Sequence, residues 1–291
     1  MTWLLWLGLV LCVLTAAELG LAVVGAKRWA NTTRALALRL EASRTDSKAQ
    51  LPPATRYNAH ELEGLPEPVQ RYFRAVLKDG QPIIAAVTIE LAGSFNLAAG
   101  GEQWKPFTSR QRVAVHRPGF LWNAKVSMLP GVTVRVIDSY IAGKGLLRAA
   151  VLGLFTVASV RGGGEIARGE FMRFLAEAPW YPTALLPSQG VRWEAVDEHS
   201  ANATLTDGPL TLTLLFGFND ADMIDSVCAK ARGAMVGKEV VMLPWESAMS
   251  NYQVRSSMTV PINGQAAWVR PEGRKPYFLG TITSLAYEFA E

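Results

Sequence analysis

The pattern of apolar and polar positions changes sharply near residue 26. From Trp3 to Ala26 the side chains are almost continuously apolar, and Glu18 is the one charged residue among them. A helix rises 1.5 Å per residue and needs about 20 apolar residues to cross a bilayer core, so this run is long enough to span. A cleavable signal peptide is the alternative, but the start MTW has no basic residue and the apolar run is too long. We therefore expect an uncleaved single-pass transmembrane anchor over residues 1–28.

The residues after this run predict an amphipathic helix and then a linker. Trp29, Leu36 and Leu40 recur on one side of a helix over residues 29–45, with arginines elsewhere. Such a helix suits a lipid surface, although a solvated extension of the anchor has the same pattern. Polar residues and a pair of prolines over residues 45–53 indicate a linker. We expect residues 29–56 to form a basic juxtamembrane helix and linker, and residues 57–291 to form a single β-rich globular domain.

Within the domain, helical spacing gives way to strand alternation. The prolines of LPEP at residues 65–68 open a helix that ends at Asp79-Gly80. Beyond Pro82 the apolar positions alternate, as in VTIEL at residues 87–91, and turn residues recur about every ten positions. Residues 146–160 are more uniformly apolar, which predicts an interior segment. The later strands are expected at 200–206, 209–218, 222–230, 254–270 with a break at 261–264, and 277–289.

Only one further helix is expected, over residues 165–178, and it ends at Pro179. The regular alternation of strand and helix that marks a doubly wound fold is absent. The predicted fold class is therefore mainly β with a few helices (α+β): a large curved antiparallel sheet or half-open barrel, preceded by the transmembrane helix.

The charge distribution argues against a nucleic-acid surface. The seven basic and two acidic residues over 27–56 carry a net +5, more than the total of +4 for the whole chain. The basic character is thus a juxtamembrane property, and we expect no nucleic-acid partner. Basic residues beside a span favour the cytoplasmic side, so the main domain is expected in the cytoplasm, with the exported face of the inner membrane as the alternative. Glu18 either contacts a partner helix or lies nearer to one of the membrane interfaces.

No familiar catalytic or cofactor motif stands out. His60, His116 and His199 are isolated and no CxxC or HExxH spacing occurs, so we expect no metal, and no cofactor is indicated. Ser188 and His199 are eleven residues apart with no placed third group, which is weak support for a hydrolase. The two cysteines, Cys12 and Cys228, are too far apart in the chain to indicate a disulfide framework. No catalytic residue can be assigned.

The most informative stretch lies over residues 169–194, where a helix end and two proline turns bracket aromatic rings. These side chains could wall a pocket, and a pair of carboxylates two helical turns apart could perform acid–base chemistry. The simpler interpretation pairs Arg173 with both acids as a surface stripe and places the rings in the core. The candidate ligand-binding residues are Trp180, Tyr181, Ser188, Gln189, Trp193, Glu170 and Glu177.

Several segments resemble a known family. LPEPVQRYFR at residues 65–74, WKPF at 104–107, FLWNAK at 120–125 and above all PWYPTALLPSQGVRW at 179–193 are similar to an uncharacterised family of bacterial membrane-anchored proteins, a domain of unknown function. The resemblance covers roughly residues 60–290. It implies a bacterial origin and a single β-rich domain, and it assigns no catalytic residue.

Three functions from different classes remain open. The anchor, the near-neutral Trp-rich domain and the lack of a catalytic motif favour a protein that binds an apolar or lipid-like small molecule near the bilayer, with membrane lipid as its partner. A half barrel like those of lipoprotein carriers fits this architecture by analogy of shape alone. The alternatives are a membrane-associated hydrolase or isomerase that uses Glu170 or Glu177, and a scaffold that binds a protein through a sheet edge.

Overall fold

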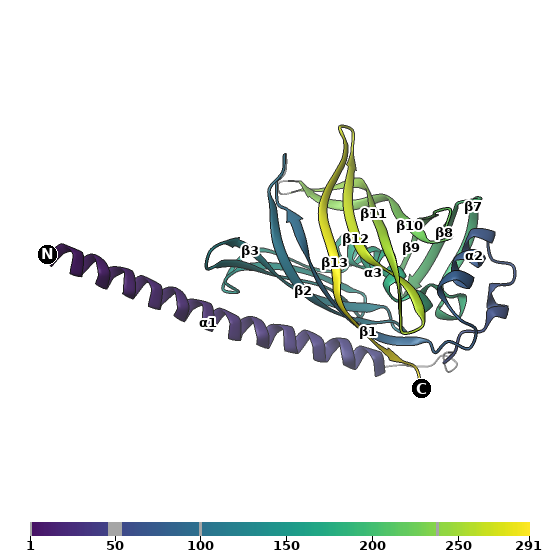
Figure 1. Ribbon diagram of the computed structural model, residues 1–291, viewed down its shortest axis with the longest axis horizontal. Coiled ribbons are helices and arrows are strands. Elements are labelled where there is room, and N and C mark those ends of the chain that lie inside the picture. Colours follow the sequence, from purple (N-terminus) through teal and green to yellow (C-terminus); the bar gives the residue numbers. More distant parts are fainter. Residues whose placement is uncertain (1, 46–53, 99–100, 237–238) are drawn as a thin grey trace.

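The chain folds around one large antiparallel sheet of 13 strands (Figure 1). The computed structural model describes residues 2–45, 54–98, 101–236 and 239–291. The strands are β1 (Ile84–Asn96), β2 (Trp104–Ala114), β3 (Gly119–Leu129), β4 (Val132–Ile141), β5 (Lys144–Val151), β6 (Phe155–Gly162), β7 (Arg192–Asp197), β8 (Ser200–Asp207), β9 (Leu210–Phe218), β10 (Ile224–Val236), β11 (Glu239–Arg255), β12 (Met258–Arg270) and β13 (Gly273–Phe289).

The sheet consists of two meanders joined in the middle. One runs from β1 to β6 and the other from β7 to β13, and β1 pairs with β13 to connect them. Strands β6 and β7 are the two edges, so the sheet is not closed into a barrel. The predicted fold class, a large curved antiparallel sheet with a few helices, is confirmed.

The chain passes from edge strand β6 to edge strand β7 through the central segment. This segment contains α3 (Gly164–Ala176) and three short 3-10 turns, η2 (Ala178–Trp180), η3 (Pro182–Leu185) and η4 (Pro187–Gln189). Its apolar side chains join the main core, together with those of α2 (Glu67–Val76), which follows the short turn η1 (Ala59–Leu62). The helix expected over 165–178 is confirmed, but it ends at Ala176: Glu177 caps it and Ala178 begins η2, because Pro179 cannot continue a helix.

Helix α1 (Thr2–Thr45) is one continuous rod of 44 residues, about 66 Å long at 1.5 Å per residue. The N-terminal end of α1 projects beyond the sheet (Figure 1), and the helix is long and apolar enough to cross a membrane. The linker expected over residues 45–53 lies, except for Thr45, outside the described residues.

The C-terminal half of α1 packs on the sheet. Trp29, Leu36 and Leu40 are buried in a second apolar cluster with side chains of β2, β3, β4 and β5, and the indole N–H of Trp29 donates to Asn123 Oδ1 at 2.9 Å. Both expectations for residues 29–45 are therefore wrong, because the apolar side of this helix faces neither lipid nor water. The packing of this half on the sheet fixes the direction of α1 relative to the domain.

Two strand predictions also require correction. Residues 146–160 do not run through the interior: they form most of the β5–β6 hairpin at the sheet edge, where Phe155 and Val157 are 58% and 63% exposed. The expected break at 261–264 is absent, since Pro261 pairs with Tyr252 inside β12. The chain turns instead at Ser256 and Ser257, whose φ angles of 47° and 65° suit a tight hairpin.

Candidate ligand-binding site

Helix α3 carries its charged side chains into the protein. Its apolar face, including Phe171 and Leu175, is buried in the main core. Glu170, Arg173 and Glu177 follow one another on the adjoining face, yet the Arg173 and Glu177 side chains are each 14% exposed and Glu170 is 4% exposed. The expected surface stripe is therefore wrong, because the flank of the helix that bears these charges also turns toward the sheet.

Arg173 is the centre of a closed hydrogen-bond network. Its Nε lies 2.6 Å from Glu177 Oε1 and its Nη1 lies 3.0 Å from Asp138 Oδ2 on β4. Its Nη2 donates to Gln111 Oε1 at 3.0 Å, and the Gln111 amide donates to Glu177 Oε2 at 2.6 Å. Charge-assisted bonds of this length bind strongly, and they hold both Glu177 oxygens in place.

Two arginines of this region also lie over aromatic rings. The Arg173 guanidinium carbon is 4.9 Å from the centre of the Trp122 ring. Arg232 on β10 lies 4.8 Å from the Trp245 ring and 5.9 Å from the Trp268 ring. Across the described part of the chain, no carboxylate forms an ion pair with Arg232. Its N–H donors are therefore free to meet a ligand, while the aromatic rings stabilise its charge.

Glu170 is held in its neutral form. Burial raises its pKa from an ordinary 4.5 to about 8, and the nearby negative charge of Asp138 adds to the shift. Burial also raises the pKa of Asp138, although Arg173 opposes that effect. With Glu170 protonated near neutral pH, the cations of Arg173 and Arg232 face the carboxylates of Asp138 and Glu177, so the cluster is balanced in charge.

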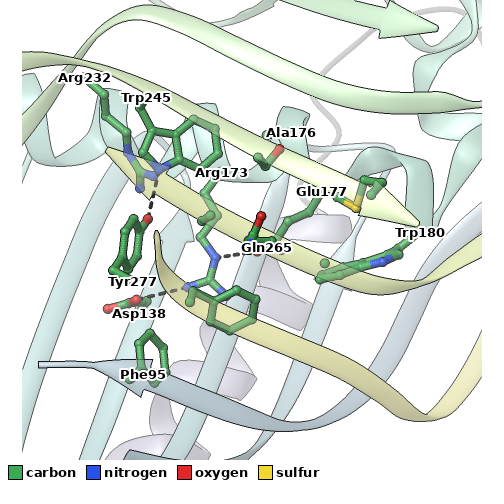
Figure 2. Close-up of a pocket in the computed structure, with 15 residues that line it drawn as sticks. Phe95, Asp138, Arg173, Ala176, Glu177, Trp180, Arg232, Trp245, Gln265 and Tyr277 are labelled. Carbon is green, nitrogen blue, oxygen red and sulfur yellow. Dashed lines mark hydrogen bonds and ion pairs between the residues drawn. The ribbon is translucent and has the colours of Figure 1, made fainter. Parts of the chain in front are cut away.

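A small cavity of about 90 Å³ lies next to this cluster (Figure 2). Asp138, Arg173, Glu177 and Arg232 form its charged part, and aromatic rings form much of the remainder. The indole N–H of Trp245 donates to the Tyr277 hydroxyl at 2.9 Å, which fixes two of those rings. The other lining residues are Phe95, Ala176, Trp180, Ser247, Met249, Gly264, Gln265, Ala266 and Phe278.

Gly264 on β12 allows Trp180 to lie against the sheet. A Cβ atom at this position would be 2.7 Å from Trp180 Cζ2, closer than real contacts allow. The Trp180 ring is 2% exposed, and its backbone carbonyl accepts a hydrogen bond from the Tyr287 hydroxyl at 2.7 Å. The ring therefore forms a rigid wall of the cavity.

Of the seven residues predicted from the sequence, three gather at this place. Trp180 and Glu177 line the cavity, and Glu170 belongs to the charge cluster beside it. Glu170 Oε2 is buried and has no hydrogen-bond partner among the described residues.

The other four predicted residues lie away from the cavity. Tyr181 is fully buried and donates its hydroxyl to the Phe174 carbonyl at 2.6 Å. Trp193 on β7 is in the core, where its indole N–H donates to the Leu185 carbonyl at 2.9 Å. Ser188 is exposed and Gln189 is half-buried at the η4 turn. A direct contact of these four with a ligand stays a prediction.

The sequence reasoning missed Asp138, Gln111 and Arg232. A signal for Asp138 exists, since it occupies an inward position in the alternating series of Val134, Val136 and Tyr140. An acid on the apolar face of a strand needs a buried partner, and Arg173 supplies it. Arg232 gives no such signal, because a bulge between Ala229 and Arg232 shifts the alternation of β10.

The open sheet, its helix-filled hollow and the long apolar N-terminal helix define an α+β protein built on a half-open antiparallel sheet. The family profile described as a family of unknown function, DUF6920, matches residues 63–287, and the chain belongs to that family. The resemblance to a domain of unknown function is thus confirmed. A comparison with curated proteins finds no match.

Two solved structures show a distant likeness. The LolA superfamily protein NE2245 from Nitrosomonas europaea has 9% sequence identity and a TM-score of 0.41, over 77% of this chain and 93% of that one. A beta-barrel-like protein of the domain of unknown function DUF1849 from Brucella abortus has 11% identity and a TM-score of 0.22, over 71% of this chain and 99% of that one. At these scores neither likeness bears on function.

Proposed function

We propose that this protein is a membrane-anchored binding protein for an apolar, lipid-like molecule with a polar end. The observation that carries the proposal is the cavity beside α3, which combines aromatic walls with a charged end. Arg232 supplies N–H donors there that no described carboxylate engages by an ion pair. A ligand with both an apolar and a polar part matches such a lining.

The volume of the cavity limits what enters it. About 90 Å³ is room for a few water molecules or a small polar group, not for an alkyl chain. The polar end of the ligand therefore occupies the cavity beside Arg232. Its chain lies toward Phe95 and Phe278, partly buried rings that pack on each other with centres 5.3 Å apart. Moving one such ring pair costs about 0.5–1.5 kcal/mol, which ligand burial offsets.

Helix α1 is the anchor in this proposal, and membrane lipid is the partner of its N-terminal half. The described Trp, Leu and Val side chains of that half are exposed on the protein, as a span requires. The basic residues that follow the span favour a cytoplasmic domain, and an exported domain would need the opposite insertion. The binding cavity is thus tied to the bilayer surface.

The contacts of the two helix carboxylates favour binding over acid–base chemistry. Both oxygens of Glu177 accept hydrogen bonds at 2.6 Å, from Arg173 and from Gln111, which hold the carboxyl group in place. Glu170 belongs to the charge cluster but does not line the cavity. A hydrolase or isomerase that uses Glu177 would have to break the Arg173 network, and one that uses Glu170 would need an acid that does not line the cavity.

Native mass spectrometry of the full chain, released from mild detergent, tests the proposal. The wild-type protein is expected to retain a lipid-sized mass, and Ala266→Phe is expected to lose it because the ring fills the cavity. Arg232→Gln should lower the retained fraction several-fold. Arg192→Gln is the matched control, since the Arg192 side chain is 71% exposed on β7, and it should behave as wild type.

Two results would contradict the binding proposal. One is a bare protein mass for the wild type under conditions in which other membrane proteins keep lipid. The other is equal retention by wild type and Ala266→Phe, provided that both unfold at the same temperature.

A further inference from the structure

The tips of two hairpins lie against the membrane-spanning half of α1. A Cβ atom at Gly25 would run into the Leu152 carbonyl and the Leu154 side chain at the β5–β6 turn. Gly25 is buried, so the missing side chain permits a direct contact between the helix and this turn. The β3–β4 turn lies closer to the N-terminus of α1, beside Glu18, because a Cβ atom at Gly131 would be 2.6 Å from Glu18 Oε1.

The positions of Glu18 and Gly25 along α1 give the depth of each turn in the bilayer. From Trp3, Glu18 lies roughly 22 Å along the helix and Gly25 roughly 33 Å, at 1.5 Å per residue. A bilayer core is about 30 Å thick. With Trp3 at the far interface, the β3–β4 tip beside Glu18 is inside the hydrocarbon region, and the β5–β6 tip beside Gly25 is at the near interface.

The side chains at both tips suit this depth. Leu129 and Phe155 are 66% and 58% exposed, and Val157 beyond the turn is 63% exposed. On the outer surface of a soluble domain such residues would face water at a cost of about 25 cal/mol per Å². Here their apolar surface adjoins that of α1, where the described Trp, Leu and Val side chains before Gly25 are exposed.

Basic side chains lie at the level where lipid headgroups are expected. Lys27 and Arg28 are exposed on α1, two and three residues after Gly25. The Arg148 guanidinium on β5 is 5.7 Å from the centre of the Trp29 ring, and Arg135 on β4 lies beside the β5–β6 turn. Basic residues around an apolar tip match the anionic headgroups that border the hydrocarbon core.

We infer that the β3–β4 and β5–β6 hairpins form a second membrane contact, in which their tips enter the lipid layer beside α1. The occupant of this surface is the bilayer itself. The inference rests on the proposed anchor, but it does not depend on what the cavity binds. It also accounts for Glu18, whose carboxylate lies against the β3–β4 turn, so a protein contact accompanies this acid within the hydrophobic span.

Depth-dependent fluorescence quenching in vesicles tests the inference. The full chain with Cys12→Ser and Cys228→Ser receives one cysteine at a time for a fluorescent label, at Leu129, at Leu9 within the span, or at Val196. Val196 is 50% exposed on β7, at the opposite end of the domain from the β3–β4 tip (Figure 1). The vesicles contain phosphatidylcholine and phosphatidylglycerol, with spin-labelled acyl chains as the quencher.

The label on Leu129→Cys should be quenched about as strongly as that on Leu9→Cys and several-fold more than that on Val196→Cys. Quenching at Leu9 without quenching at Leu129 would overturn the hairpin contact and leave the anchor intact. Absence of quenching at both positions would overturn the anchor as well. Neither result depends on ligand retention in the mass spectrometer, so failure of the cavity proposal is recognised separately.

Discussion

Replacing Arg173 by methionine tests whether the charged flank of α3 is a buried network or a surface stripe. The change keeps the length and apolar stem of the side chain but removes the cation that faces Asp138 and Glu177. An exposed pair is worth about 0–1 kcal/mol, whereas removing one partner of a buried pair costs about 3–5 kcal/mol because the remaining charge is uncompensated. Since the Arg173 side chain is 14% exposed, we expect Arg173→Met to lower the free energy of unfolding by about 3–5 kcal/mol.

Urea unfolding of the full chain in mild detergent, followed by tryptophan fluorescence, measures this difference. Arg192→Met is the matched control and should change stability by less than about 0.5 kcal/mol, as surface substitutions usually do. Adding Asp138→Asn to Arg173→Met should restore most of the loss, because the Glu177 carboxylate and the Arg232 guanidinium that remain in the cluster then balance in charge. A loss below about 1 kcal/mol, or no recovery in the double variant, would refute the buried-network interpretation.

Three further predictions follow from the same contacts. Glu170 keeps its proton in the folded state up to about pH 8 but loses it near pH 4.5 when the chain is unfolded, so the free energy of unfolding should fall as pH rises between these values. Glu170→Gln should flatten that slope in a pH series of urea unfolding. Gly264→Ala should destabilise the protein by about 1–3 kcal/mol because the new Cβ meets the Trp180 ring. Gly169→Ala inside α3 should instead stabilise it by about 0.5–1 kcal/mol, because alanine favours a helix. Equal effects of the two variants in thermal unfolding would contradict this. Trp29→Ala should speed amide hydrogen exchange in the second half of α1 by at least tenfold, and unchanged exchange would contradict packing of α1 on the sheet.

The alternation of apolar side chains was sufficient to predict the sheet and many of its strands, but it did not predict β2 or most of β11. It worked where one face of a strand is buried and the other is wet, as in β1 and β3, because the period of two then reports the geometry directly. The uniform apolarity of residues 146–160 misled, because the apolar residues Phe155, Val157 and Val160 of β6 are exposed at a sheet edge. Hydrophobicity alone does not distinguish a buried strand from one that meets lipid.

The charged cluster was harder to predict, because its members come from separate parts of the chain. Arg173 and Glu177 are neighbours on one helix, and their spacing suggested an ion pair. Their partners Gln111 and Asp138 lie on β2 and β4, which the sheet brings together only after β3 has paired with both. Spacing along one element therefore identified the ion pair, but it could not show that the pair is buried.

The same distinction explains α1. Its sequence shows a helix with an apolar side at Trp29, Leu36 and Leu40, and lipid is the first partner to consider for such a side next to a span. The partner is instead the outer face of the sheet, where Ile137 and Ile141 on β4 are buried against it. An amphipathic pattern predicts that one face of a helix is buried, but it does not identify what that face packs against.

This packing changes how the domain relates to the bilayer. A domain on a flexible linker samples many orientations, and a cavity within it meets the membrane surface only at intervals. Here the helix continues from the proposed span to Leu40 without a break, and residues from Trp29 onward are held by the sheet, so span and domain share one rigid element. With the hairpin tips as the proposed second contact, both the height and the rotation of the domain over the bilayer would be set. A fixed orientation keeps the cavity at one distance from the lipid surface, which is what a binding site for a membrane-derived amphiphile requires.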